Sequence, residues 1–162
     1  MSKFVFRYFA DCEDGQMARL ETAESGIPVN IFAEDGTDFD LQDGECCKVE
    51  LYGIGSQVDV YSTAEAMYAA GSKMAGPSMI PMGTFPPKDA GEPFEESAHI
   101  LFVGTVLEVD TDPEANENQP NYCLKVETLG MTLQLYLRHE GLIEVGSILH
   151  GVAWLFGPVT RA

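Results

Sequence analysis

The chain has 162 residues, with 26 acidic against 9 basic side chains and a net charge of −17. This length suits one domain with a sizeable core, and the acidity argues against binding to nucleic-acid phosphates or to anionic membranes. Four cysteines without a CxxC motif, and no apolar run of membrane-spanning length, predict a reduced, cytoplasmic protein without disulfides. The preferred interpretation of the acids is that they keep loops soluble, and the alternative is an acidic face that binds a basic protein partner.

The first fifty residues predict short strands joined by turns. Lys3–Ala10 alternates as a strand, and Asp14-Gly15 is a hairpin signal. Gln16–Ala23 returns as a second strand, with a helix as the alternative. Ile27–Ala33 is a short strand in which Pro28 marks a start or an edge. These segments predict a β-rich N-terminal part.

An acidic stretch follows, with turns at Asp-Gly pairs. Its weak metal-ligand candidates are four aspartates: Asp35, Asp38, Asp40 and Asp43. Carboxylates at this density can bind calcium, but their spacing does not match the EF-hand pattern. Solvated turns are therefore the preferred interpretation, and no metal or other cofactor is predicted.

A predicted strand at Glu45–Gly53 is expected to pair with Gln57–Tyr61 across a Gly-Ile-Gly-Ser turn. Cys47, Val49 and Leu51 alternate with polar residues and should face inward. The chain then predicts one short helix near residues 63–71. Ser62 is the preferred N-cap, because Glu65 three residues later completes a capping box.

Residues 74–93 are rich in glycine and proline yet also apolar, which predicts an ordered crossover, with disorder as the alternative. Met79, Met82 and Phe85 are candidate binding residues in it. The preferred organisation is a single β-rich domain over 1–162. The alternative is an N-terminal β unit at 1–73 and a second unit at 94–162, with 74–93 between them.

Four strands dominate the rest of the chain and alternate with a period of two. They are Ile100–Asp110, Tyr122–Thr128, Met131–Arg138 and Ser147–Phe156. The second and third should form a hairpin across Leu129-Gly130, with glycine taking a positive φ. The first and fourth are apolar on both faces, which predicts an interior position. The polar segment Asp110–Asn121 is a loop between strands.

The runs HILFVGTVLEVD, NYCLKVETLG, MTLQLYLRHE and IEVGSILHGVAWLFG resemble an OB-fold barrel over about residues 94–160. The resemblance implies a small, mainly β barrel or sandwich of antiparallel strands. The usual helix between the third and fourth strands is missing or reduced to Leu142–Glu144, and a fifth strand must come from elsewhere, for example from Glu45–Gly53. The outward face of the hairpin offers Tyr136 and Arg138 as binding residues, which is few for nucleic acid.

The motifs of catalysis and nucleotide binding are missing from the sequence. The histidines His99, His139 and His150 have no metal-site spacing. We therefore expect a non-catalytic binding or interaction module with an acidic surface. The alternatives are a small metal-assisted hydrolase that uses the acidic-loop carboxylates, and an acidic nucleic-acid mimic that inhibits a DNA-binding protein.

Overall fold

The computed structural model describes residues 2–12, 15–69, 78–80, 97–129 and 131–162. These residues are mainly β, with a closed five-stranded barrel and one short helix, as predicted. In chain order the elements are β1 (Ser2–Cys12), β2 (Gly15–Thr22), β3 (Pro28–Ala33), β4 (Cys46–Val49), β5 (Tyr52–Tyr61), α1 (Ala64–Ala69), β6 (Ser78–Ile80), β7 (His99–Thr111), β8 (Tyr122–Thr128), β9 (Met131–Leu137), β10 (Ile148–Gly157) and β11 (Val159–Arg161). Among the described residues, no helix is long and apolar enough to cross a membrane.

Two compact units share these elements. The sheet unit comprises Met1–Leu51, Pro81–Ile100 and Trp154–Ala162, and the barrel unit comprises Tyr52–Ile80 and Leu101–Ala153. The preference for a single domain stays a prediction.

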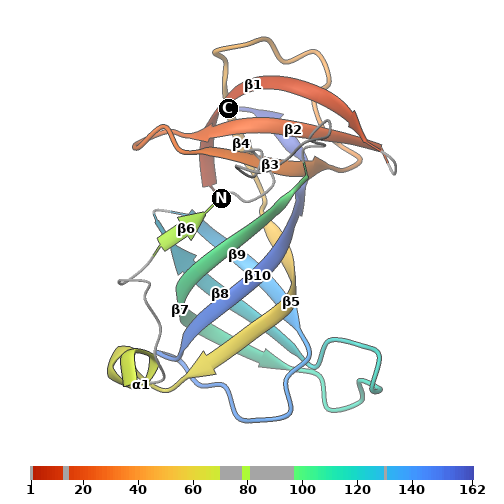
Figure 1. Ribbon diagram of the computed structural model, residues 1–162. Helices are drawn as coiled ribbons and strands as arrows, with labels where there is room; N and C mark the ends of the chain where they lie inside the picture. Colours follow the sequence, from red (N-terminus) through yellow and green to blue (C-terminus); the bar gives the residue numbers. More distant parts are fainter. Residues whose placement is uncertain (1, 13–14, 70–77, 81–96, 130) are drawn as a thin grey trace, which may run out of the picture. The chain divides into compact units, whose positions relative to one another are not determined.

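In the sheet unit, β4, β1, β2 and β3 lie side by side as an antiparallel sheet (Figure 1). Alternate side chains of these strands form its core: Phe4, Phe6, Leu20, Val29, Ile31, Cys47 and Val49 are all at most 2% exposed. The inward placement predicted for Cys47 and Val49 is confirmed. Gln16–Ala23 forms a strand rather than the alternative helix, since its residues pair with both β1 and β3.

The C-terminal segment covers both edges of this sheet. Phe156 and Gly157 pair in parallel with β3, and Val159 to Arg161 pair antiparallel with β4. The Thr37 hydroxyl accepts a hydrogen bond from the Val159 backbone N–H at 3.1 Å. Because unpaired edge strands invite association with other chains, this segment protects the sheet as well as extending its core.

In the barrel unit, five strands wrap around one core (Figure 1). β7, β8 and β9 form an antiparallel meander, β9 pairs in parallel with β5, and β10 lies between β5 and β7. The core-facing residues of the central hairpin match the sequence pattern: Tyr122, Leu124, Val126, Met131, Leu133, Leu135 and Leu137 are all buried. The barrel closes tightly at Gly151, where an added Cβ would lie 2.0 Å from the Gln57 carbonyl oxygen.

Four details of the predicted elements are wrong. Tyr52–Tyr61 is one continuous strand, so the Gly-Ile-Gly-Ser segment is no turn, and β5 rather than Glu45–Gly53 is the fifth barrel strand. The helix is capped by Thr63 instead of Ser62, because the Thr63 hydroxyl accepts from the Ala66 N–H at 3.1 Å. The positive φ predicted for Gly130 is not among these errors, because Gly130 lies outside the described residues; its neighbour Leu129 has a φ of 40°.

The fourth error concerns Trp154, which the apolar run placed in the interior. It is 45% exposed, while its neighbours Ala153 and Leu155 are fully buried. β10 therefore has one buried face and one partly exposed face at this point. Apolar residues on both faces of the strand did not indicate that both faces are buried. The Trp154 ring packs against His99, with 5.2 Å between ring centroids.

Candidate functional site

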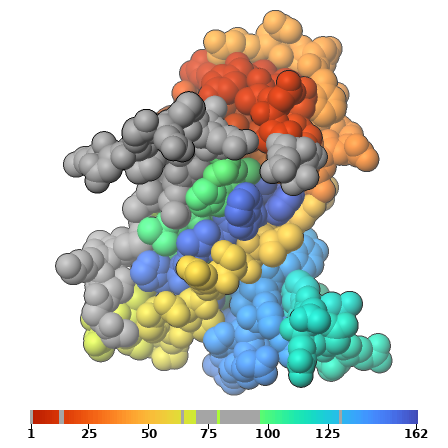
Figure 2. Space-filling view, turned by 45° about the vertical axis from the view of Figure 1, so that its right-hand side comes forward, coloured from red at the N-terminus to blue at the C-terminus, as the bar shows by residue number. Residues whose placement is uncertain are grey.

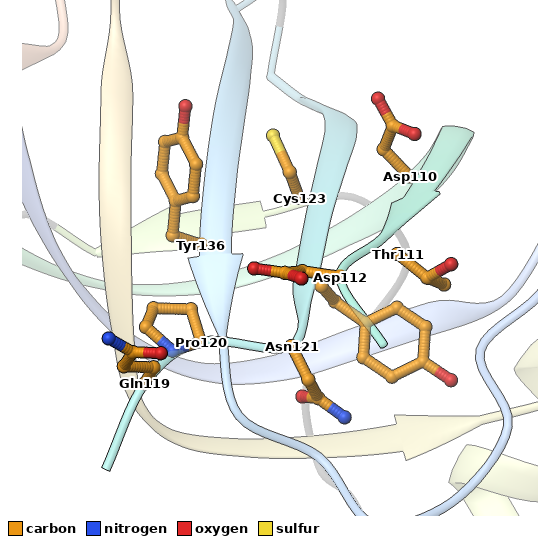
Figure 3. A pocket seen from close by; sticks show the side chains of 9 residues that line it. Asp110, Thr111, Asp112, Gln119, Pro120, Asn121, Cys123 and Tyr136 are labelled. Atoms are coloured by element: carbon orange, nitrogen blue, oxygen red, sulfur yellow. The ribbon is translucent and has the colours of Figure 1, made fainter. Parts of the chain in front are cut away.

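An open groove of about 510 Å³ lies at one end of the meander in the barrel unit (Figure 3). Its lining comes from the end of β7, the loop that follows, the start of β8 and the end of β9. The lining residues are Asp110, Thr111, Asp112, Gln119, Pro120, Asn121, Tyr122, Cys123 and Tyr136. The volume falls within the range of about 300–1,000 Å³ that is typical of ligand pockets.

Strand register brings three of these residues into one row. Asp110 pairs with Cys123 across β7 and β8, and Cys123 pairs with Tyr136 across β8 and β9. Directly paired residues of antiparallel strands point to the same face. Because Tyr122 and Leu124 on either side of Cys123 are buried, the row lies on the outer face of the barrel.

The loop over the groove is held by hydrogen bonds to the end of β9. The Asn121 side chain donates to the His139 carbonyl oxygen at 2.8 Å and accepts from the His139 N–H at 2.9 Å. Arg138 donates to the Asn116 carbonyl oxygen at 3.0 Å. Figure 2 shows the teal loop as a projection beside the light-blue strand region of the same unit. These contacts give the polar loop a defined position.

Tyr122 forms another fixed part of the groove. Its hydroxyl donates to the Gly141 carbonyl oxygen at 2.9 Å and accepts from the Ile143 N–H at 3.3 Å. The ring belongs to the buried face of β8, and only 8% of the residue is exposed. Tyr122 therefore connects the groove to the segment after β9, and its hydroxyl is already hydrogen-bonded within the protein.

Tyr136 presents a half-buried aromatic ring to the groove. The ring meets Tyr52 edge to face, with centroids 6.1 Å apart and an interplanar angle of 88°. A hydrogen bond with the Cys123 thiol raises the pKa of Tyr136, and the charge of that group and partial burial act in the same direction. A phenol normally titrates near pH 10. Tyr136 is therefore neutral at physiological pH.

The groove also carries two carboxylates, Asp110 and Asp112, which form no ion pair with any residue that the structure describes. Asp112 accepts one hydrogen bond, from the Glu114 backbone N–H at 3.1 Å. In Figure 3 its carboxylate extends towards the side of the groove where Tyr136 and Pro120 lie. The groove therefore offers an aromatic surface beside negative charge.

The predicted binding residues have different positions. Tyr136 lines the groove, and Arg138 anchors its loop and pairs with Glu140 at 3.2 Å. Met79 is buried in β6, opposite Phe102 of β7. Met82 and Phe85 lie outside the described residues. The polar composition of Asp110–Asn121 indicated a loop, but Asp110 and Cys123 carried no signal of their own, because their shared face depends on strand register.

Most of the weak metal candidates already have partners in the sheet unit. Asp38 accepts from the Arg161 backbone N–H at 2.8 Å, and Asp40 and Glu45 each lie 3.3 Å from the Arg161 guanidinium. Asp43 pairs with Arg7 at 3.0 Å. In the part of the chain that the structure describes, no three His, Cys, Asp or Glu residues gather to hold a metal ion.

A serine–histidine contact in the sheet unit was not predicted. The Ser97 hydroxyl hydrogen-bonds to His99 Nδ1, and the Asn30 side chain donates to the Ser97 carbonyl oxygen at 3.1 Å. The His99 ring also packs on Trp154, as described above. These contacts account for His99 as part of the packing of this unit.

No protein-family model matches the chain, and comparisons with curated proteins and with solved structures give no match either.

Proposed function

We propose that this protein is a non-catalytic interaction module, and that the groove at Asp110, Asp112 and Tyr136 binds a basic segment of a protein partner. The observation that carries the proposal is the pair of groove carboxylates without an ion-pair partner among the described residues, next to a half-buried aromatic ring. A cationic side chain in the groove satisfies both features, since it pairs with carboxylates and is attracted to the face of an aromatic ring.

The charge of the whole chain supports the same class of partner. A net charge of −17 attracts basic segments over distances of about a Debye length, near 8 Å at physiological ionic strength, and repels nucleic acid. Complementary charge mainly raises the rate of association, and the groove then provides the specific contacts. The same charge also suits the nucleic-acid mimic, because the DNA-binding protein that it would inhibit is basic as well. The aromatic ring beside the groove carboxylates is what favours a specific basic segment.

The position of the groove supports an OB-like barrel. OB barrels have five strands, and they bind ligands at strands two and three and at the loop between strands one and two. If β7 is taken as strand one, the groove lies at that loop and at β8 and β9. β5 supplies the fifth strand from earlier in the sequence, which supports our proposal that the barrel is a permuted form of the OB arrangement.

The test is a titration of the ¹⁵N-labelled protein with a short peptide of repeated Gly-Ser-Lys units, and with a Gly-Ser-Glu peptide of equal length as control. We expect saturable amide shifts at Asp110–Asp112, Asn121–Cys123 and Tyr136 with the basic peptide alone. Equal shifts with the acidic peptide, or shifts confined to the Asp38–Glu45 segment, contradict the proposal.

A further inference from the structure

We infer that the groove is specific for arginine, so that a guanidinium group lies against Tyr136 with its N–H groups directed at Asp110 and Asp112. This inference rests on the proposed function and narrows it to one side chain. Three features of the groove support it: the polar atoms that remain open to a ligand, the aromatic ring, and the spread of the acceptors over separate elements.

Internal hydrogen bonds already use much of the polar lining. The Asn121 amide is bound to the His139 backbone through both its oxygen and its nitrogen, and the Tyr122 hydroxyl both donates and accepts. The Gln119 side-chain oxygen accepts from the Asn116 N–H at 3.3 Å. The carboxylates of Asp110 and Asp112 contribute most of the hydrogen-bonding capacity that remains. Ionised carboxylates accept hydrogen bonds but do not donate them. A ligand group with several donors and no acceptor fits these atoms.

The ring of Tyr136 favours a planar cation. The ring is fixed from one side by the edge-to-face contact with Tyr52 and from another by the hydrogen bond with Cys123. A guanidinium is flat, delocalised and weakly hydrated, so it stacks on aromatic rings more readily than an ammonium group. Because the position of the ring is already fixed in the free protein, binding of a cation to it costs little side-chain conformational entropy.

The two carboxylates and the aromatic ring lie on different elements of the fold. This arrangement favours a ligand group that carries several hydrogen-bond donors in a fixed geometry. Asp110 lies in β7, Asp112 lies in the loop, and Tyr136 lies in β9. Arginine has five N–H donors in one plane and contacts separate acceptors at the same time, whereas lysine concentrates its charge at one point. The preference for arginine over lysine therefore follows from geometry as well as charge.

The experiment compares three fluorescent peptides built from repeated Gly-Ser-Xaa units, in which Xaa is arginine, lysine or citrulline. Citrulline has nearly the shape of arginine without the charge. We expect the arginine peptide to bind about fivefold tighter than the lysine peptide and at least about tenfold tighter than the citrulline peptide, as charge-assisted hydrogen bonds require. The measurement is fluorescence anisotropy at low and at physiological salt.

Two variants test the role of the ring. Tyr136→Phe keeps the aromatic face and should keep the arginine preference, whereas Tyr136→Leu should bring the affinities of the arginine and lysine peptides within about twofold. Circular dichroism of both variants checks that the barrel has folded. If the Leu variant does not fold, the Phe variant alone tests the inference, because the arginine preference must persist in it.

Equal or tighter binding of the lysine peptide to the unmodified protein overturns the arginine inference and leaves the proposed function standing. Binding of the citrulline peptide as tight as that of the arginine peptide overturns both, because charge then has no role. Loss of the arginine preference in a folded Tyr136→Phe protein also overturns the inference, since the aromatic face is intact.

Discussion

The two units use their acidic side chains in opposite ways. In the sheet unit, Arg161 pairs with Asp40 and Glu45, and Arg7 pairs with Glu21 and Asp43. In the groove of the barrel unit, Asp110 and Asp112 have no cationic partner among the described residues. Acidity in the sheet unit is thus partly balanced within the fold, and acidity in the groove is available to a ligand.

This difference shows that the net charge of a chain does not indicate which of the described acids lack a cationic partner within the fold. The densest acidic run of the sequence lies in the sheet unit, and several of its carboxylates hold backbone and arginine groups in place. Of the two groove aspartates, Asp110 lies near the end of β7 and Asp112 lies in the less conspicuous loop that follows. Their availability comes from what surrounds them rather than from their number.

The largest expected effect tests whether the two units unfold together. Leu124→Ala removes a fully buried side chain from the barrel core and should lower the free energy of unfolding by about 2–5 kcal/mol. Leu142→Ala is the matched control, because Leu142 is 74% exposed and its loss should change stability by less than about 0.5 kcal/mol.

Calorimetry and urea unfolding followed by Trp154 fluorescence measure this effect. A single unfolding transition that shifts as a whole in Leu124→Ala indicates one cooperative domain, as the sequence predicts. Both units then share one free energy of unfolding. Two transitions, of which only one moves, indicate two domains and contradict the single-domain prediction. An equal loss of stability in the two leucine variants contradicts the assignment of Leu124 to the core.

The second effect concerns binding. Asp110→Asn combined with Asp112→Asn should weaken binding of the arginine peptide about tenfold, equivalent to about 1.4 kcal/mol. Asp40→Asn combined with Asp43→Asn removes the same charge from the sheet unit and should weaken binding less than about twofold, through long-range attraction alone. Anisotropy titration measures both. Equal losses in the two double variants would show that only overall charge matters.

An effect of similar size is expected from the hydrogen bonds that hold the loop. Asn121→Ala removes both side-chain hydrogen bonds to the His139 backbone and should destabilise the barrel by about 1–2 kcal/mol. Asn118→Ala, in the exposed part of the same loop, is the control and should have little effect. Thermal unfolding measures the difference. If the two variants melt alike, the amide of Asn121 does not hold the loop.

The smallest effect is a pH dependence in the sheet unit. The hydrogen bond from the Gln42 N–H, followed by that from Arg161, lowers the pKa of Glu45 below its usual value. A lowered folded-state pKa stabilises the fold above the unfolded pKa of about 4.3, and this stabilisation is lost as the pH falls through the folded-state pKa. Glu45→Gln should therefore flatten the dependence of the melting temperature on pH below the unfolded pKa of about 4.3.

Arg161→Gln separates the two causes of this shift. It leaves the Gln42 hydrogen bond to Glu45 intact, so it should flatten the pH dependence less than Glu45→Gln does. An unchanged pH dependence in Glu45→Gln would show that other carboxylates dominate the acid unfolding. The measurement is the thermal midpoint by circular dichroism at a series of pH values.

Much of the fold is predictable from local patterns in the sequence. The alternation of Tyr122–Thr128 and Met131–Leu137 predicts a hairpin with one buried face, and burial confirms it residue by residue. A period of two is a local property, because successive side chains of any strand point to opposite faces. Asp35-Gly36 and Asp43-Gly44 likewise predict turns, and both glycines have a positive φ.

What depends on distant parts of the chain is decided by tertiary structure. The parallel pairing of Tyr52–Ile54 with Gln134–Tyr136 closes the barrel, and no local pattern indicates a partner some eighty residues away. The groove arises in the same way, since Asp110, Cys123 and Tyr136 become neighbours only through the register of three strands. Composition indicated an acidic binding protein. Which acids remain open to a ligand depends on where Arg7 and Arg161 lie in the folded chain, because an ion pair forms only between groups that folding brings within contact distance.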